Sequence, residues 1–289
     1  MRQIELDDVR LSALTWGSEG PLAVLLHGFP DTAYTWRHLG PALAGDGFRV
    51  VAPFTRGYAP SGCPGDGRTD VGALMADAVG IHAALDGGDG AVLVGHDWGA
   101  LTAGALAAHR DSPYARVVTM AVPPIPAMRK VAARHLPGQA RRSWYIGFNQ
   151  LPFLPERSLD RLVPKLWRDW SPGYDASEDL PHVLEALATP EHRRAAIGYY
   201  RNLARPWGIP ARYRRWQGSL SRAPIVPTLY LHGRDDGCLS PRLAEHVEEV
   251  LPPGSAAHVV PDAGHFLHLE QPDQVGTLVR ESSPAELRL

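Results

Sequence analysis

The chain has 289 residues, of which 44% are hydrophobic and 21% are charged, and its formal net charge is −2. This composition is typical of a folded protein with a sizeable core and excludes a largely disordered chain. A charge so close to zero gives no indication of a nucleic-acid partner.

The first residues carry acids, Glu5, Asp7 and Asp8, where a secretory signal would need an apolar core. No apolar run approaches the roughly 18 residues of a membrane span. We therefore expect a cytoplasmic protein with no membrane span. The two cysteines, Cys63 and Cys238, lack the spacing of a metal site, and we interpret both as structural or incidental.

Hydrophobic patterning predicts a regular alternation of strands and helices. Residues 3–16 alternate apolar and polar side chains, as a hairpin does. Further strands are expected near 22–28, 48–54, 91–96, 116–122, 226–232 and 256–261, and helices near 33–44, 69–86, 98–110, 240–251 and 272–282. Such alternation predicts an α/β fold with a mainly parallel sheet and helices on both faces.

The pattern changes between residues 124 and 223, which are rich in aromatic residues, arginine and proline and show no clear strand. We expect this segment to be a separate helical cap on a core formed by residues 1–123 and 224–289. Residues 124–222 hold 17 Lys and Arg against 8 Asp and Glu, an excess that we interpret as a solvated surface or a contact with the acidic core. Five of the eight tryptophans also lie there and are predicted to wall an apolar pocket: Trp144, Trp167, Trp170, Trp207 and Trp216.

Asp97 lies in a Gly-His-Asp-Trp-Gly turn, residues 95–99, between an apolar strand and an Ala/Leu-rich helix. The related Gly-x-Ser-x-Gly turn carries a serine nucleophile at this position. A carboxylate that attacked a carbonyl would give an unfavourable anhydride, whereas attack on saturated carbon gives an ordinary ester. The turn therefore favours ring opening or displacement by Asp97, although a helix-capping aspartate is the simpler alternative.

A second strand ends at His27 and Gly28, and we expect its loop to turn the backbone N–H of Phe29 toward Asp97. Together with the N–H of Trp98, it would form an oxyanion hole. Two later strand ends carry acids after Gly233 and a histidine at 265. The chain order of nucleophile, acid and histidine is the order of the α/β-hydrolases.

On these motifs the chain resembles the epoxide hydrolase and haloalkane dehalogenase branch of the α/β-hydrolases over nearly its whole length, most closely the epoxide hydrolases. The resemblance implies the α/β-hydrolase fold, with a mainly parallel eight-stranded sheet, flanking helices and a helical cap inserted after strand 6. It also implies that His265 is the base and that Asp236, rather than the neighbouring Asp235, orients it.

Two tyrosines of the cap decide the expected reaction. Tyr145 and Tyr200 lie in segments similar to those that carry the ring-opening tyrosines of epoxide hydrolases, while Tyr199 points in another direction on the same helix. Tyrosine stays protonated at neutral pH and can give a proton to the opening ring. We thus expect a hydrolase acting on ether bonds that converts a small apolar epoxide and water to a diol, without cofactor or metal; a homodimer is left open.

Other functions remain as alternatives. Haloalkane dehalogenases also have a tryptophan at the position of Trp98, but Phe29 stands where we would expect their second halide donor and has no side-chain N–H. A cyclase that opens an epoxide without water, or a ligand-binding protein on the same frame, is the remaining alternative.

Overall fold

A computed structural model describes residues 1–282 of the chain. One sheet of eight strands forms its centre, in the order β1-β2-β4-β3-β5-β6-β7-β8. The pairs β1/β2 and β2/β4 are antiparallel and the other pairs are parallel. The strands are β1 (Arg2–Glu5), β2 (Arg10–Trp16), β3 (Leu22–Leu26), β4 (Arg49–Pro53), β5 (Val92–His96), β6 (Arg116–Met120), β7 (Thr228–Gly233) and β8 (Ala256–Val260).

Helices flank this sheet as two separate pairs, in which α1 packs with α12 and α2 packs with α3. The strands β3 and β5 are buried along their whole length, as expected for parallel strands covered on both faces. The core helices are α1 (Leu39–Gly45), α2 (Val71–Ala84), α3 (Trp98–Ala107), α11 (Leu267–Glu270) and α12 (Pro272–Ser282), with 3₁₀ turns η1 (Ala33–Trp36), η4 (Pro241–Ala244) and η5 (Glu248–Val250). The predicted α/β-hydrolase architecture is confirmed.

Two predicted helices differ from the structure. The helix expected at 33–44 is divided into η1 and α1, and this division puts Pro41 in the first turn of α1, where its missing N–H is not needed. The prediction of one helix at 240–251 is wrong, because the chain forms the two 3₁₀ turns η4 and η5 there. Leu243 and Val247 are buried four residues apart, as in a helix, but their backbone N–H groups bond to carbonyls three residues back.

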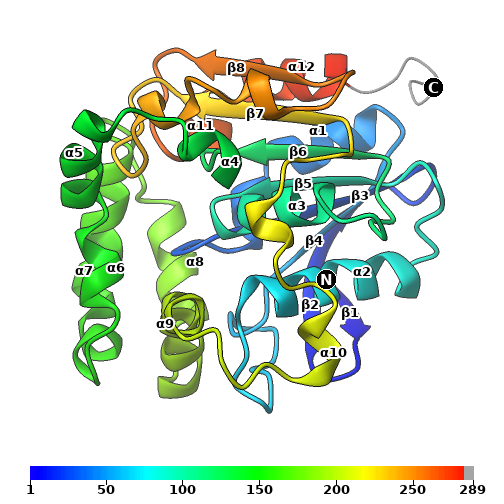
Figure 1. Ribbon diagram of the computed structural model, residues 1–289. Coiled ribbons are helices and arrows are strands. Elements are labelled where there is room, and N and C mark those ends of the chain that lie inside the picture. The colour runs from blue at the N-terminus through cyan, green and yellow to red at the C-terminus, as the bar shows by residue number, and fades with distance from the viewer. Residues whose placement is uncertain (283–289) are drawn as a thin grey trace.

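The segment between β6 and β7 contains helices and no strand. In Figure 1 its helices α5 to α9 stand at the left, at the end of the sheet toward which the arrowheads of β6 and β8 point. We retain 124–223 as the proposed bounds of the cap. Its elements are α4 (Ile125–Met128), η2 (Ala133–His135), α5 (Leu136–Arg142), α6 (Trp144–Phe148), α7 (Leu154–Trp170), α8 (Asp179–Ala186), α9 (Pro190–Ala204), α10 (Ala211–Arg214) and η3 (Ser219–Ser221).

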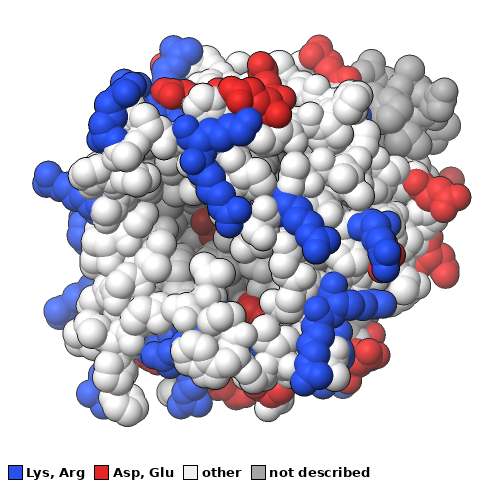
Figure 2. Space-filling model, viewed as in Figure 1, with Lys and Arg blue, Asp and Glu red and all other residues white. Residues whose placement is uncertain are grey.

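The surface of the cap carries much of the positive charge. Figure 2 shows Lys and Arg side chains along the left margin of the molecule, over α5 and α7. Among residues 1–282, no helix is long and apolar enough to cross a membrane.

Candidate active site

Asp97 stands at the turn between β5 and α3 in a strained conformation, with φ +52° and ψ −113°. A Cβ atom on Gly95 would lie 2.1 Å from the carbonyl oxygen of Gly99, and one on Gly99 would lie 2.0 Å from that of Leu26. Only glycine therefore fits on either side of the turn. The side chain of Asp97 makes no capping hydrogen bond to α3. The capping interpretation fails, and the turn instead holds the carboxylate at the carboxyl end of the sheet.

The loop after β3 meets this turn because β3 and β5 are neighbours, with Leu26 paired to Gly95 in register. The backbone N–H of Phe29 donates a hydrogen bond of 2.8 Å to Oδ1 of Asp97. A Cβ on Gly28 would lie 2.4 Å from the same oxygen and 2.7 Å from the backbone N of Trp98. The two N–H groups predicted for the oxyanion hole thus belong to chain segments that lie against the Asp97 carboxylate.

His265 lies between two carboxylates. Its Nδ1–H donates to Oδ2 of Asp236 at 2.9 Å, and its Nε2 lies 3.5 Å from Oδ2 of Asp97. The other oxygen of Asp236 accepts the backbone N–H groups of Cys238 and Leu239, at 2.7 and 2.9 Å. These bonds fix the Asp236 carboxylate and with it the plane of the imidazole. The structure therefore brings together the three side chains that the sequence singled out, while Asp235 faces solvent.

The electrostatics follow from this arrangement. Burial by itself would lower the pKa of His265, but the carboxylates of Asp236 and Asp97 outweigh it and raise that pKa to about 10. Burial would raise the pKa of Asp236, but His265 and the hydrogen bonds to its oxygens hold it below its ordinary value. At neutral pH the imidazole of His265 is thus protonated.

Tyr145 of α6 and Tyr200 of α9 come together above this group. Their rings meet edge to face with centroids 5.6 Å apart, and the ring of Tyr200 also contacts Phe29 and Trp98 at 5.1 and 5.2 Å. Burial raises the pKa of both hydroxyls well above 10, so both stay protonated. The hydroxyl of Tyr200 makes no hydrogen bond of ordinary geometry among residues 1–282 and can donate to a ligand.

Tyr199, the neighbour of Tyr200 on α9, points elsewhere. Its hydroxyl donates to the carbonyl oxygen of Arg56 at 2.9 Å and lies 3.1 Å from Oγ1 of Thr55. It is therefore engaged beside the loop after β4 and does not share the direction of Tyr200, as the sequence predicts.

Two further side chains lie at the site: Cys238, which the sequence left as structural or incidental, and Trp170, one of the five tryptophans predicted to wall the pocket. The thiol of Cys238 lies 3.3 Å from the hydroxyl of Tyr145, where either atom can donate. The ring of Trp170 contacts those of Tyr145 and His265, at 4.9 and 5.0 Å, and its carbonyl oxygen accepts the backbone N–H of His265. Neither contact has a local sequence signal, because each joins segments far apart in the chain.

The predicted wall of five cap tryptophans is wrong for two of them. Trp144 and Trp207 are 40% and 68% exposed and cannot line a closed pocket. Trp167 is buried and stacks on Phe266, with its N–H donating to the carbonyl of Pro30. Of the five, Trp170 is the one in ring contact with the proposed base.

Two histidines next to the site support the backbone. Nε2 of His27 accepts the N–H of Thr55, and Nε2 of His96 donates to the carbonyl oxygen of His265 at 2.9 Å. Burial lowers the pKa of His27 to about 4 and that of His96 to about 3, so both rings are neutral. The neutral ring of His96 thus supports the backbone of His265 without placing a second positive charge beside its imidazole.

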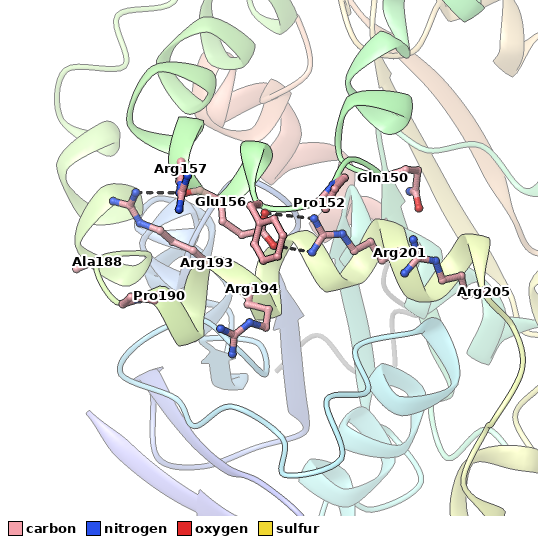
Figure 3. Close-up of a pocket in the computed structure, with 11 residues that line it drawn as sticks. Gln150, Pro152, Glu156, Arg157, Ala188, Pro190, Arg193, Arg194, Arg201 and Arg205 are labelled. Carbon is pink, nitrogen blue, oxygen red and sulfur yellow. Dashed lines mark hydrogen bonds and ion pairs between the residues drawn. The ribbon is translucent and has the colours of Figure 1, made fainter.

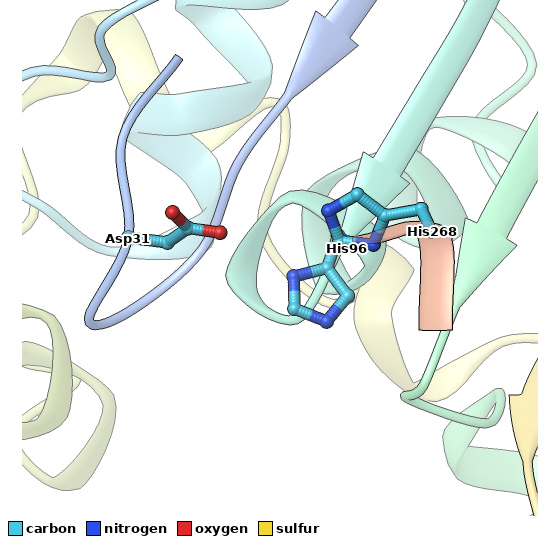
Figure 4. A group of neighbouring side chains, drawn as sticks. All are labelled: Asp31, His96 and His268. Carbon is cyan, nitrogen blue, oxygen red and sulfur yellow. The ribbon is translucent and has the colours of Figure 1, made fainter. Parts of the chain in front are cut away.

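Figure 4 shows a buried group, Asp31, His96 and His268, that could offer one ligand atom each to a metal ion, as could Asp236, Cys238 and His265. In each group the ligand atoms lie within 4.8 Å of one another. In the second group the side chains of Asp236 and His265 already bond to each other, so an ion would compete with that hydrogen bond.

The side chains of this site are closed off from solvent. Asp97, Tyr145 and Tyr200 are 6%, 4% and 3% exposed, and His265 is fully buried. A ligand that reached these side chains would meet hydroxyl donors on one side and a carboxylate on the other.

Comparison with known proteins finds a family and several relatives to which this chain is similar. Residues 21–272 match the family described as alpha/beta hydrolase fold. The AB hydrolase superfamily protein YfhM of Bacillus subtilis is 32% identical, over 91% of this chain and 90% of its own length. Epoxide hydrolase A of Mycobacterium tuberculosis is 31% identical over 97% of this chain and 96% of its own length. The crystal structure of Epoxide Hydrolase A from Mycobacterium thermoresistibile, 27% identical, superposes with a TM-score of 0.75 over 97% of each chain.

Proposed function

The chain belongs to the alpha/beta hydrolase fold family, in the branch of the epoxide hydrolases, and on that premise we propose that it hydrolyses an epoxide to a vicinal diol through an ester on Asp97. It would then be a hydrolase acting on ether bonds, with a small apolar epoxide and water as its substrates. The observation that carries the proposal is the pair of buried, protonated tyrosines beside an aspartate held at positive φ.

In the first step, Tyr145 and Tyr200 donate hydrogen bonds to the ring oxygen. A carboxylate oxygen of Asp97 attacks a ring carbon, the carbon–oxygen bond of the ring breaks, and a tyrosine proton passes to the alkoxide. Neutral donors suit this step because they polarise the ring without pairing with the carboxylate that must attack. The product is a hydroxyalkyl ester on Asp97.

In the second step, His265 takes a proton from a water molecule that attacks the carbonyl carbon of the ester. The ester C–O bond then breaks, the diol leaves with the other proton of that water, and Asp97 returns as a carboxylate beside protonated His265. The N–H of Phe29 already bonds to Oδ1 of Asp97 and stabilises the oxyanion that develops there, together with the N–H of Trp98. Esterification also removes the charge of Asp97, one of the two carboxylates that raise the pKa of His265. The pKa of His265 therefore falls once the ester has formed, and its proton can pass to the tyrosinate left by ring opening, so that a neutral imidazole faces the ester.

The dehalogenase alternative receives less support. Phe29 has no side-chain donor for a departing halide, and its ring packs edge-on against Tyr200. An activity assay with epoxides and haloalkanes separates these reactions. Epoxide hydrolysis gives a diol, a dehalogenase releases halide, and a cyclase gives neither. A cytoplasmic location and a homodimer stay predictions from the sequence.

Trapping of the ester tests whether Asp97 forms it and His265 is needed to hydrolyse it. The His265→Gln variant, incubated with styrene oxide, should gain the full mass of one epoxide on the peptide that contains Asp97, because the ring opens by addition. The Asp97→Asn variant is the matched control and should gain none. Wild-type turnover of styrene oxide, with no adduct in His265→Gln, would contradict the two-step mechanism.

A further inference from the structure

An open groove of about 800 Å³ lies between α7 and α9 on the cap, and none of the proposed reacting side chains lines it. Figure 3 shows the side chains around it. Five arginines and one glutamate supply its charges: Arg157, Arg193, Arg194, Arg201, Arg205 and Glu156. We refer to this feature as the arginine groove.

Two of the five arginines are already neutralised. Arg201 forms a two-pronged ion pair with Glu156, and this pair holds the pKa of that carboxyl below its ordinary value although burial acts in the opposite direction. Arg193 donates to both oxygens of Asp160, at 2.7 and 3.1 Å. The groove therefore keeps a net positive charge after its internal ion pairs are counted.

The other three, Arg157, Arg194 and Arg205, are exposed. Within residues 1–282 their guanidinium groups make no hydrogen bond or ion pair. Guanidinium groups offer planar pairs of donors that match the two oxygens of a carboxylate. Three such groups around one hollow attract an anion.

Apolar side chains line and border the same groove. Phe153, in its lining, is 73% exposed and has a positive φ of 62°, which few residues other than glycine adopt. Leu151 and Leu154, on either side of it in the chain, are 44% and 50% exposed. Pro152 and Pro190 add further apolar lining. An exposed apolar cluster beside unpaired positive charge fits a ligand that has both an anionic head and an apolar chain.

We propose that the arginine groove binds a long-chain carboxylate, with its head on the free arginines and its chain on the apolar lining. The concave shape and volume favour a single amphiphile over the flat surface of a membrane, since pockets of this size typically hold one small molecule. The site is separate from the proposed reaction. Two of its lining residues reach the segment of Tyr200: Arg201 follows Tyr200 in the chain, and Gln150 donates to the backbone carbonyl of Tyr200 at 3.1 Å.

Binding of sodium decanoate, measured by calorimetry, tests the proposal with three ligands. Decanoate should bind, while acetate, which has only the head, and decan-1-ol, which has only the chain, should bind at least tenfold more weakly. Each added methylene should strengthen binding by up to about fourfold, and added salt should weaken it. Equal binding of decanol and decanoate would overturn the proposal.

Variants locate the ligand. Arg157→Gln combined with Arg194→Gln should weaken decanoate binding at least tenfold, and Phe153→Ser several-fold. The matched controls are Arg110→Gln, whose side chain is 89% exposed, and Val259→Ser, whose side chain lies on β8 and is 48% exposed; both should bind decanoate as the wild type does. Undiminished binding by the groove variants, or binding to phosphatidylglycerol vesicles without binding of free decanoate, would refute the assignment. None of these measurements depends on epoxide turnover.

Discussion

Replacing Asp97 by asparagine should lower the pKa of His265 from about 10 toward neutrality. Asparagine keeps the shape of the side chain and removes its charge, as esterification of Asp97 would. The substitution therefore isolates the electrostatic part of the proposed switch, in which the loss of one carboxylate frees the base.

The magnitude follows from the distance between the two groups. Nε2 of His265 lies 3.5 Å from Oδ2 of Asp97. At an effective dielectric constant of about 20, opposite unit charges at that separation attract by about 5 kcal/mol. This energy corresponds to a fall of roughly three and a half pKa units when the charge is removed. Asp236 remains in the variant, so His265 should keep its Nδ1 proton and change only at Nε2.

The pKa can be read from the imidazole nitrogen shifts of histidine-labelled protein, with the spectrum of His265→Gln to assign the signal. Asp235→Asn is the control, because that carboxylate is exposed and is not among the groups that raise the pKa of His265. A pKa in Asp97→Asn equal to that of the wild type would refute the coupling, and the ester would then have no electrostatic means to release the base.

The interaction between His265 and Asp97 should also appear in how the free energy of unfolding depends on pH. Because the pKa of His265 is raised on folding, its contribution to stability is fully present below about pH 6.5 and is lost as the pH rises through about 10. In Asp97→Asn that contribution should be smaller and should be lost at lower pH. Urea unfolding across this pH range measures the difference between the two proteins.

Three other changes have defined outcomes. Tyr145→Phe or Tyr200→Phe should each slow diol formation by about 10² to 10³, the usual effect of losing one donor to a developing oxyanion; an unchanged rate would favour the dehalogenase alternative. Gly28→Ala should abolish activity because its Cβ would lie 2.4 Å from the Asp97 side chain, whereas Gly104→Ala, whose nearest neighbour would be 3.9 Å away, should retain it. Arg56→Met should lower the free energy of unfolding by about 3 to 5 kcal/mol, since it leaves the buried Asp77 carboxylate unpaired. An unchanged free energy of unfolding in urea denaturation would contradict this prediction.

Much of the site could be predicted because its residues follow strand ends. Parallel neighbouring strands bring their carboxyl ends to one edge of the sheet, so the pairing of Leu26 with Gly95 carries Phe29 to Asp97, and that of Gly233 with Val260 carries Asp236 toward His265. These positions depend on local patterns that a sequence displays.

The remaining features depend on contacts between distant segments. Nothing near Cys238 indicates that its thiol meets Tyr145, and nothing near Trp170 distinguishes it from the exposed Trp144. Apolar periodicity also reports which side of a segment is buried but not whether its backbone closes as an α-helix or a 3₁₀ turn. The segment 240–251 was mispredicted for that reason.

The central claim is that a carboxylate oxygen of Asp97 leaves with the product and is replaced from water. A single turnover with enzyme in excess over styrene oxide, in water enriched in heavy oxygen, tests it by mass spectrometry of the peptide that contains Asp97 and of the diol. The mechanism predicts one heavy oxygen in the Asp97 side chain and none in the diol. Heavy oxygen in the diol, with an unlabelled Asp97, would contradict it.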